Sequence, residues 1–301
     1  LYGIPSHHLE EGDGASGAVL RRGYLTANWN FNRSLSARAR LEINQSGEFE
    51  TYTFDTEFKD LFLEWKSGRQ RFLLGLAPTP TFDLIESAWG FRYLARTPMD
   101  LQGVPSRDTG VFAKGPLNQS GTLAYRALLG AGTDFESDGN DEKSGFRGAL
   151  TWSPSPGWTL DFYADFNRTE GRADRHTLQG FVGYQDEQYR WGAQYSNQDR
   201  EEEAPLELAS AFAAARVSKR LELIGRIDRL IEPSPRGNDI AYIPFDPSAP
   251  ATMMIGALEF KPTSHIAVTP NVVFIRYDIN DEGIRPTDDL HLRLTLFLDF
   301  E

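Results

Sequence analysis

Five histidines are the side chains in this sequence best suited to acid–base or metal chemistry, and the 301-residue chain contains no cysteine. They are His7, His8, His176, His265 and His291. Two adjacent histidines without further ligands are weak evidence for a metal site, because zinc sites use three or four protein ligands. A lipase-like site needs a serine paired with a histidine, and no expected strand places both on its apolar face. The sequence therefore predicts no catalytic residue, no metal site and no cofactor.

Carboxylates are a second group of side chains that could take part in chemistry, in this case the binding of a metal ion. Segment 134–142 carries five of them and resembles a calcium-binding run, which would also let it bridge to lipopolysaccharide through divalent ions. Its spacing is not that of an EF-hand loop, so a solvated acidic loop is the favoured interpretation. The formal net charge of −12 argues against a nucleic-acid partner, which would require a basic face.

Most other charged residues alternate with apolar ones, and segment 290–300 shows this most clearly. Every second residue from Leu290 to Phe300 is apolar, and the residues between them are His291, Arg293, Thr295, Phe297 and Asp299. Side chains of a β-strand point to opposite faces with a period of two. The alternation covers the ~9–11 residues that a tilted strand needs to cross a bilayer. It predicts a transmembrane strand with a lipid-facing leucine row.

The same alternation recurs along the chain. Strands are expected at 19–31, 35–44, 52–66, 69–76, 109–116, 122–131, 145–153, 159–167, 176–185, 189–196, 207–218, 221–231, 252–261, 266–278 and 290–300. In 52–66 and 266–278 the inward parity changes midway, which indicates a bulge or a misplaced boundary. No apolar run approaches the roughly 18 residues of a transmembrane helix.

The connections between these strands alternate in length. Short turns lie near 32–34, 67–68, 117–120, 153–157, 186–188, 218–220 and 262–264; longer polar loops lie near 45–51, 77–107, 132–144, 168–175, 197–206, 232–250 and 279–288. Outer-membrane barrels have short periplasmic turns and longer extracellular loops. A soluble sandwich or propeller, the alternative, has shorter strands and gives no reason for this alternation.

The predicted fold class is therefore an all-β, antiparallel up-and-down transmembrane barrel, forming a single domain over 1–301. The final strand must run toward the periplasm, so an outward strand should precede 19–31. Only residues 1–4 are available for it before a polar loop to Gly17, which predicts a truncated first strand and about 16 strands in all. No signal peptide is present at Leu1, so an exported chain would be in mature or trimmed form.

Sixteen strands enclose a lumen wide enough for water. Charged residues on the inward rows are tolerable there if they are hydrated or paired. The residues predicted to face the lumen are Arg22, Arg38, Arg40, Glu42, Arg126, Arg147, Asp161, Asp165, Arg190, Arg226 and Arg293. We expect passive diffusion of small polar solutes or ions past these charged residues. The alternative is that the residues only form ion pairs along the barrel wall.

Loop 77–107 is too apolar for a solvated loop. Phe82, Ile85 and Trp89 need a surface to pack on, and Thr81 is a candidate cap for a helix ending near Ala95. Long loops without a function are uncommon in compact proteins, so we expect this one inside the lumen; an external lid or subunit contact is the alternative. The predicted constriction residues are Asp83, Glu86, Arg92, Arg96, Asp100, Arg107 and Asp108.

The runs 68–80 (GRQRFLLGLAPTP) and 106–111 (SRDTGV), which flank this loop, resemble the phosphate- and polyphosphate-selective porin family. That resemblance implies a sixteen-stranded porin of the Gram-negative outer membrane, commonly trimeric, with an internal constriction loop. Its anion specificity would rest on an arginine ladder and a lysine cluster; the lysines have no match here. Glu301 after Phe300 also departs from the usual aromatic C-terminus. We therefore expect a weak ion preference.

The expected surroundings are outer-membrane lipid and lipopolysaccharide, small polar or ionic solutes, and either a homotrimer or a larger envelope complex. A structural barrel that anchors or encases a protein partner is the alternative function. Conductance of the purified protein favours the porin; a copurifying partner favours the assembly role.

Overall fold

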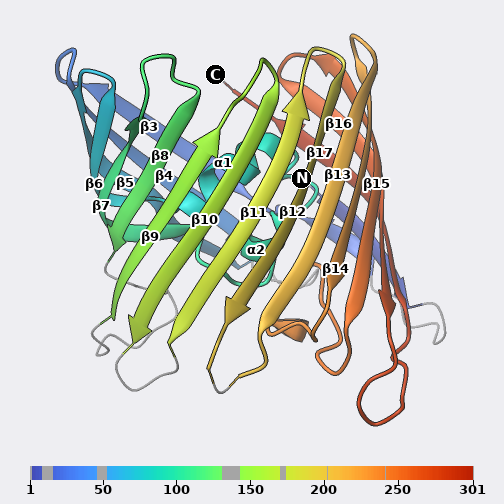
Figure 1. Cartoon of the computed structure of the whole chain (residues 1–301). Helices are drawn as coiled ribbons and strands as arrows, with labels where there is room; N and C mark the ends of the chain where they lie inside the picture. Colours follow the sequence, from blue (N-terminus) through green and yellow to red (C-terminus); the bar gives the residue numbers. More distant parts are fainter. Residues whose placement is uncertain are drawn as a thin grey trace.

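The computed structural model describes residues 2–8, 16–45, 53–130, 143–169, 174–201, 203–240 and 242–300. One 17-stranded antiparallel sheet curves into a barrel around two short helices (Figure 1). The strands are β1 (Tyr2–His8), β2 (Ser16–Val19), β3 (Gly23–Asn30), β4 (Leu35–Gln45), β5 (Phe54–Ser67), β6 (Gln70–Pro78), β7 (Arg107–Pro116), β8 (Leu123–Gly130), β9 (Lys143–Trp152), β10 (Trp158–Thr169), β11 (Arg175–Gln185), β12 (Tyr189–Asp199), β13 (Leu206–Ser218), β14 (Leu221–Leu230), β15 (Ala251–Thr263), β16 (Ile266–Tyr277) and β17 (Asp289–Leu298). The helices are α1 (Pro80–Trp89), α2 (Pro98–Leu101) and the 3-10 turn η1 (Gly237–Asp239).

The barrel closes through its first strand. β1 pairs with β17 on one side and with β2 on the other, and each later strand pairs with its successor from β3 to β17. Only residues 20–22 separate β2 from β3, so these two are halves of one interrupted strand. The sheet thus has sixteen strand positions, which confirms the predicted barrel. The expected polar loop after residue 4 is wrong, however: β1 extends to His8, which places His7 and His8 in a strand.

Short and long connections lie at opposite ends of the barrel. The turns 31–34, 68–69, 117–122, 153–157, 186–188, 219–220 and 264–265 share one end with the C-terminus, at the top of Figure 1. The longer connections 79–106, 231–250 and 278–288 lie at the other end. Gly68 and Gly157 adopt positive φ in these turns, where a side chain would be strained.

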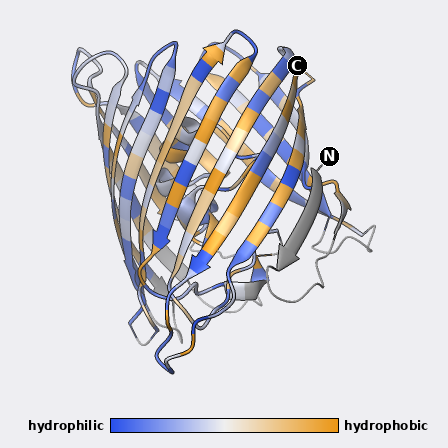
Figure 2. Ribbon diagram, turned by 90° about the vertical axis from the view of Figure 1, so that its right-hand side faces the viewer, coloured by the Kyte–Doolittle hydropathy of each residue, from blue (hydrophilic) through white to orange (hydrophobic). Residues whose placement is uncertain are grey.

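The two faces of the strands differ as their sequence alternation predicts. Leu25, Trp29, Leu74 and Leu294 are exposed on the outer wall, and hydrophobic and hydrophilic bands alternate along the strands (Figure 2). Burial alternates without a break along β16, so the predicted parity change in 266–278 is wrong. No helix in the described ranges is long and apolar enough to cross a membrane.

The change predicted in 52–66 is real. The β4–β5 register shifts between Arg40 and Leu41, which pair with Asp60 and Phe58. Lys59 is the extra residue, and such a bulge turns two consecutive side chains, Lys59 and Asp60, toward the lumen.

Two long connections fold into the barrel and share a hydrophobic core with its inner wall. Ala95, Met99, Leu101 and Val104 of connection 79–106 pack with Ile240, Ile243 and Phe245 of connection 231–250, and with Leu208, Met253, Ile255 and Ile275 of the wall. The prediction of a polar external loop at 232–250 fails here, because Ile243 and Phe245 are fully buried. Packed apolar side chains therefore fill the lumen beside strands β13–β16.

Candidate pore constriction

Connection 79–106 begins with a well-defined helix. Thr79 precedes Pro80, whose missing N–H and fixed φ suit the first turn of α1. The Thr79 hydroxyl donates to the Pro105 carbonyl at 2.9 Å, which ties the two ends of the connection together. α1 ends at Gly90, a left-handed residue with φ 72°. The expectation of a helix capped by Thr81 and reaching Ala95 is wrong, because the left-handed turn at Gly90 stops it earlier.

The apolar side of this connection packs on the barrel wall. Ile85, Trp89 and Phe91 are buried against Phe181 and Phe212, which come from β11 and β13. The Trp89 indole N–H also donates to the Ala95 carbonyl at 2.9 Å. Burying side chains of this size contributes roughly 1.5–3 kcal/mol each, so apolar packing is the main force that holds the connection inside.

Polar side chains of the wall bind the backbone of the same connection. Four carbonyl groups accept hydrogen bonds from wall residues on different strands: Pro80 from Arg126 (3.3 Å), Thr81 from Gln179 (3.4 Å), Trp89 from Arg190 (3.3 Å) and Arg96 from Arg226 (2.6 Å). The Tyr93 hydroxyl donates to Glu259, and its ring stacks on Phe297 with centroids 5.1 Å apart. The connection is thus fastened along its length.

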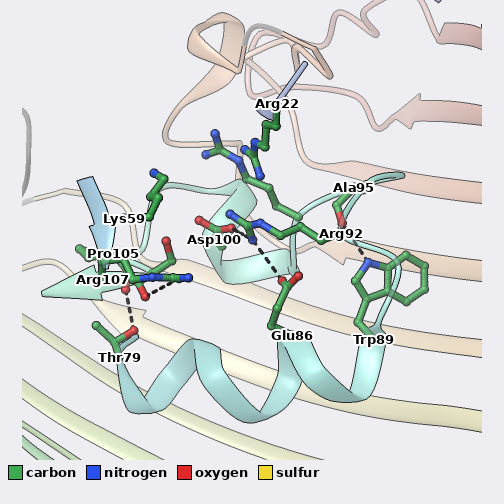
Figure 3. Close-up of polar contacts among 12 residues, drawn as sticks. Arg22, Lys59, Thr79, Glu86, Trp89, Arg92, Ala95, Asp100, Pro105 and Arg107 are labelled. Atoms are coloured by element: carbon green, nitrogen blue, oxygen red, sulfur yellow. Dashed lines mark hydrogen bonds and ion pairs between the residues drawn. The ribbon is translucent and has the colours of Figure 1, made fainter. Parts of the chain in front are cut away.

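An ion-pair cluster of Glu86, Arg92 and Asp100 occupies the opposite side, and Figure 3 shows Arg22 and Lys59 of the barrel wall beside it. The Arg92 guanidinium donates to Glu86 at 3.1 Å and to Asp100 at 2.6 Å. Burial raises the pKa of Glu86 and outweighs the attraction of Arg92. Burial also acts to raise the pKa of Asp100, but Arg92, Arg96 and Arg22 overcome it and hold that pKa below its usual value. The pKa values of these two neighbouring carboxylates are therefore shifted in opposite directions.

The bulge of β5 supplies the facing charges. Asp60 lies 3.1 Å from Arg107, 3.6 Å from Arg40 and 3.9 Å from Arg38. Lys59, labelled beside Arg107 in Figure 3, lies 3.7 Å from Glu42. Three guanidiniums around a single carboxylate leave this part of the wall with an excess of positive charge.

Cations and carboxylates of this wall also differ in exposure. The Asp60 side chain is 1% exposed, whereas those of Arg38 and Arg40 are 39% and 29% exposed. Nearer the short-turn end, Glu64 is 6% exposed and its partner Arg71 is 48% exposed. Asp60 and Glu64 thus lie beneath guanidinium groups, whereas in the Lys59–Glu57 pair of the same wall the carboxylate is the more exposed partner, at 33% against 17%.

The structure brings together part of the predicted constriction set. Glu86, Arg92 and Asp100 form one cluster, Arg96 lies close enough to lower the pKa of Asp100, and Arg107 joins it to the wall. Asp83 lies apart and pairs with Lys114 at 3.4 Å. Arg107 and Asp108 belong to strand β7, not to the loop.

Asp108 and several predicted lumen residues lie buried against their partners instead of in the open channel. The buried pairs are Asp108–Arg147, Asp228–Arg226 and Asp165 with the Tyr163 hydroxyl, and Asp161 is buried against the half-buried Arg126. Arg293, also buried, donates to the Tyr242 carbonyl, and Arg190 caps α1. Arg22, Arg38, Arg40 and Glu42 remain on the wall that faces the Arg92 cluster.

Sequence reasoning missed three residues of the site. Lys59 could have been found from the parity change in 52–66, but Arg21 and Tyr242 carry no comparable signal. Tyr242 comes from connection 231–250, and its ring lies 4.1 Å from the Arg21 guanidinium. Across the described part of the chain, no three His, Asp or Glu residues are grouped as a metal site.

The fold matches solved porin structures over nearly the whole chain. OmpT of Vibrio cholerae aligns with a TM-score of 0.64 and 14% identity, covering 99% of this chain and 96% of that one. An anion-selective porin from Comamonas acidovorans gives 0.64 and 12%, covering 99% and 98%, and Pseudomonas putida OprB gives 0.66 and 10%, covering 99% and 92%. No protein-family model matches the sequence, and no curated protein sequence matches it. The chain therefore has the fold of a porin barrel.

Proposed function

We propose that this protein is a porin of the Gram-negative outer membrane, a water-filled channel through which small polar solutes diffuse without catalysis. The porin barrel fold, the apolar outer wall and the internal loop all support this function. Connections 79–106 and 231–250 close one side of the lumen, so the conducting path is the space between the Arg92 cluster and strands β3–β7.

We further propose that the channel prefers anions. The observation that carries this is the burial of Asp60 and Glu64 beneath Arg38, Arg40 and Arg71. An exposed cation near a low-dielectric wall attracts anions over several ångströms. The acidic net charge of the chain does not oppose this preference, because potential at the constriction depends on the charges that line it. Phosphate is one such anion, as the sequence resemblance suggests. Strict selection of phosphate would need more positive charge at the constriction, because Glu86 and Asp100 neutralise part of it.

Accessible-thiol chemistry provides the test, since the chain has no cysteine of its own. Arg40→Cys should be modified in planar bilayers by a small charged thiol reagent: an anionic reagent should lower both conductance and anion preference, and a cationic reagent should restore the preference. Leu25→Cys, on the outer face of the neighbouring strand, is the matched control and should not respond. Purified protein that forms no channels would reject the proposal and favour the structural barrel that anchors a partner.

The assembly state is a second part of the proposal. One solved form of Vibrio cholerae OmpT is a trimer, and we expect this chain to form homotrimers in lipid that contains lipopolysaccharide. Light scattering of the detergent-solubilised protein, corrected for bound detergent, distinguishes trimer from monomer.

A further inference from the structure

Two arginines lie on the outer wall of the barrel at its long-connection end. Arg229 of β14 and Arg276 of β16 both pair across the sheet with Thr252 of β15, so the three side chains form one outward-facing row. This is the last outward-facing row of these strands before the connections begin. The outward carboxylate of the next strand, Glu207 of β13, is bonded to the Tyr195 hydroxyl of β12, on the side away from Arg276.

The carboxylates beside this row neutralise it only in part. Asp278 accepts from Arg229 at 2.5 Å, and Asp288 accepts two hydrogen bonds from Arg285 at 3.0 Å each. The hydrogen bond from Arg229 lowers the pKa of Asp278, and the charges of Arg276 and Arg285 act in the same direction, so all three guanidiniums lie near this carboxylate. Among the described residues, the exposed Arg276 side chain has no ion pair or hydrogen bond. Three guanidiniums therefore accompany two carboxylates, and Arg276 is the one without a partner.

The outer wall becomes apolar directly beside this row, toward the middle of the strands. Ile227, Met254 and Phe274 form the next outward-facing row. The row after it contains Gly225 and Gly256: a Cβ on Gly256 would meet nothing within 4 Å, and one on Gly225 would first meet a backbone oxygen at 4.0 Å. At a rise of ~3.3 Å per residue, this open surface lies about 13 Å along the strand from the arginines. A charged edge followed by an apolar surface with open space matches the order of groups in a phosphorylated lipid.

We propose that this surface binds lipopolysaccharide, with Arg276 holding a phosphate group and an acyl chain lying over Gly225 and Gly256. A guanidinium can donate two parallel hydrogen bonds to a phosphate, which makes arginine well suited to this group. The phosphate leaves the Arg229–Asp278 pair intact, because Arg276 is not engaged in it. The inference rests on the proposed outer-membrane function and orientation, which place the long-connection end in the outer leaflet, where lipopolysaccharide is the phosphorylated lipid.

Native mass spectrometry of the purified protein with added lipid A tests the phosphate contact. The wild type should retain diphosphoryl lipid A more strongly than dephosphorylated lipid A. Arg276→Gln should lower the retention of the diphosphoryl form severalfold. Arg220→Gln is the matched control and should not, because Arg220 is an exposed arginine in the turn 219–220, at the opposite end of β14. Equal retention by the two variants would overturn the proposal. If a variant fails to fold, equal retention of the two lipids by the wild type would overturn it.

Two further comparisons identify the lipid. Phosphatidylglycerol, which carries phosphate on a different lipid, should be retained less than diphosphoryl lipid A, and excess inorganic phosphate should displace little of the bound lipid A. Equal retention of phosphatidylglycerol, or full displacement by phosphate, would overturn the assignment to lipopolysaccharide. Gly256→Leu fills the open surface and should lower lipid A retention, whereas Gly180→Leu, at an equally open position on the outer face of β11, should not. Equal retention by these two variants would reject the acyl-chain contact.

None of these measurements depends on conduction. A protein that retains lipid A but forms no channels rejects the porin function alone. A conducting protein that retains phosphorylated and dephosphorylated lipid A equally rejects the lipid site alone.

Discussion

The guanidinium of Arg190 lies directly over the backbone of Gly90. Its Nη1 donates to the carbonyl of the preceding residue, Trp89, at 3.3 Å, and a Cβ built on Gly90 would fall 1.8 Å from that nitrogen. Gly90 adopts φ 72°, which ends α1 and turns its last carbonyls toward the wall. A positive charge at the C-terminal end of a helix is favourable. Gly90 therefore ends α1, and the contact with Arg190 of β12 holds that end of the helix against the wall.

Gly90→Ala should weaken this contact between the end of α1 and β12. A left-handed alanine costs about 1–2 kcal/mol, and its methyl group must displace the Arg190 side chain. We expect a lower unfolding midpoint in detergent and noisier single-channel current. Gly180→Ala is the matched control, because a Cβ at Gly180 meets nothing within 4 Å. Equal effects of the two substitutions would contradict this role for Arg190.

The proposed anion preference should strengthen in mild acid. Burial raises the pKa of Glu86, so this carboxylate protonates above the ordinary glutamate value of about 4.3. Asp100, whose pKa is lowered, keeps its charge in that range; its contribution to stability is lost only at still lower pH. Loss of the Glu86 charge leaves Arg92 less neutralised.

Reversal potentials in a salt gradient measure this effect. The anion-to-cation permeability ratio of the wild type should rise as pH falls from 7 toward 5. Glu86→Gln should show the raised ratio at pH 7 and little further change over the same range. An unaltered pH profile in this variant would assign the titration to another group.

Tyr93→Phe should weaken the attachment of the loop to β15. The substitution removes the hydroxyl that donates to Glu259 but keeps the ring on Phe297. A lost hydrogen bond to a buried charged group costs about 1.5–3 kcal/mol, which chemical unfolding in detergent can resolve. Tyr184→Phe is the control: its exposed hydroxyl, which donates to Asp186 at 3.0 Å, should matter much less.

The barrel was predictable because alternation and connection length each depend on local sequence. The bulge at Lys59 left a trace in the parity of 52–66, and the apolar content of the loop indicated an internal position. The ion pairs inside the barrel were not predictable in the same way. Alternation shows that Arg147 and Arg226 face inward, but only the packing of two connections decides that they are buried with Asp108 and Asp228. The strand break at 20–22 depends on a distant side chain, Gln45.

The last strand tests the proposed position in the membrane. Leu294 is exposed on the outer wall in the middle of β17, so Leu294→Arg should cost ~2–4 kcal/mol in a membrane refolding titration if it lies near the midplane. Thr295, its inward neighbour, is a poor control because it is buried and accepts a hydrogen bond from Asn271 at 2.9 Å. Asn30→Arg, at an exposed inward position of β3, is therefore the better control and should cost much less.

Cysteine labelling of intact cells tests the proposed orientation together with the fold of connection 231–250. Glu282→Cys, in the exposed connection 278–288, should react with an impermeant maleimide. Ser155→Cys, in a short turn at the opposite end, should react only after the outer membrane is permeabilised. Ile243→Cys lies at the long-connection end but is fully buried between the two infolded connections, so it should stay unlabelled in the folded protein and react after denaturation. Labelling of Ser155→Cys but not of Glu282→Cys on intact cells would reverse the orientation, whereas rapid labelling of Ile243→Cys would show that connection 231–250 leaves the lumen.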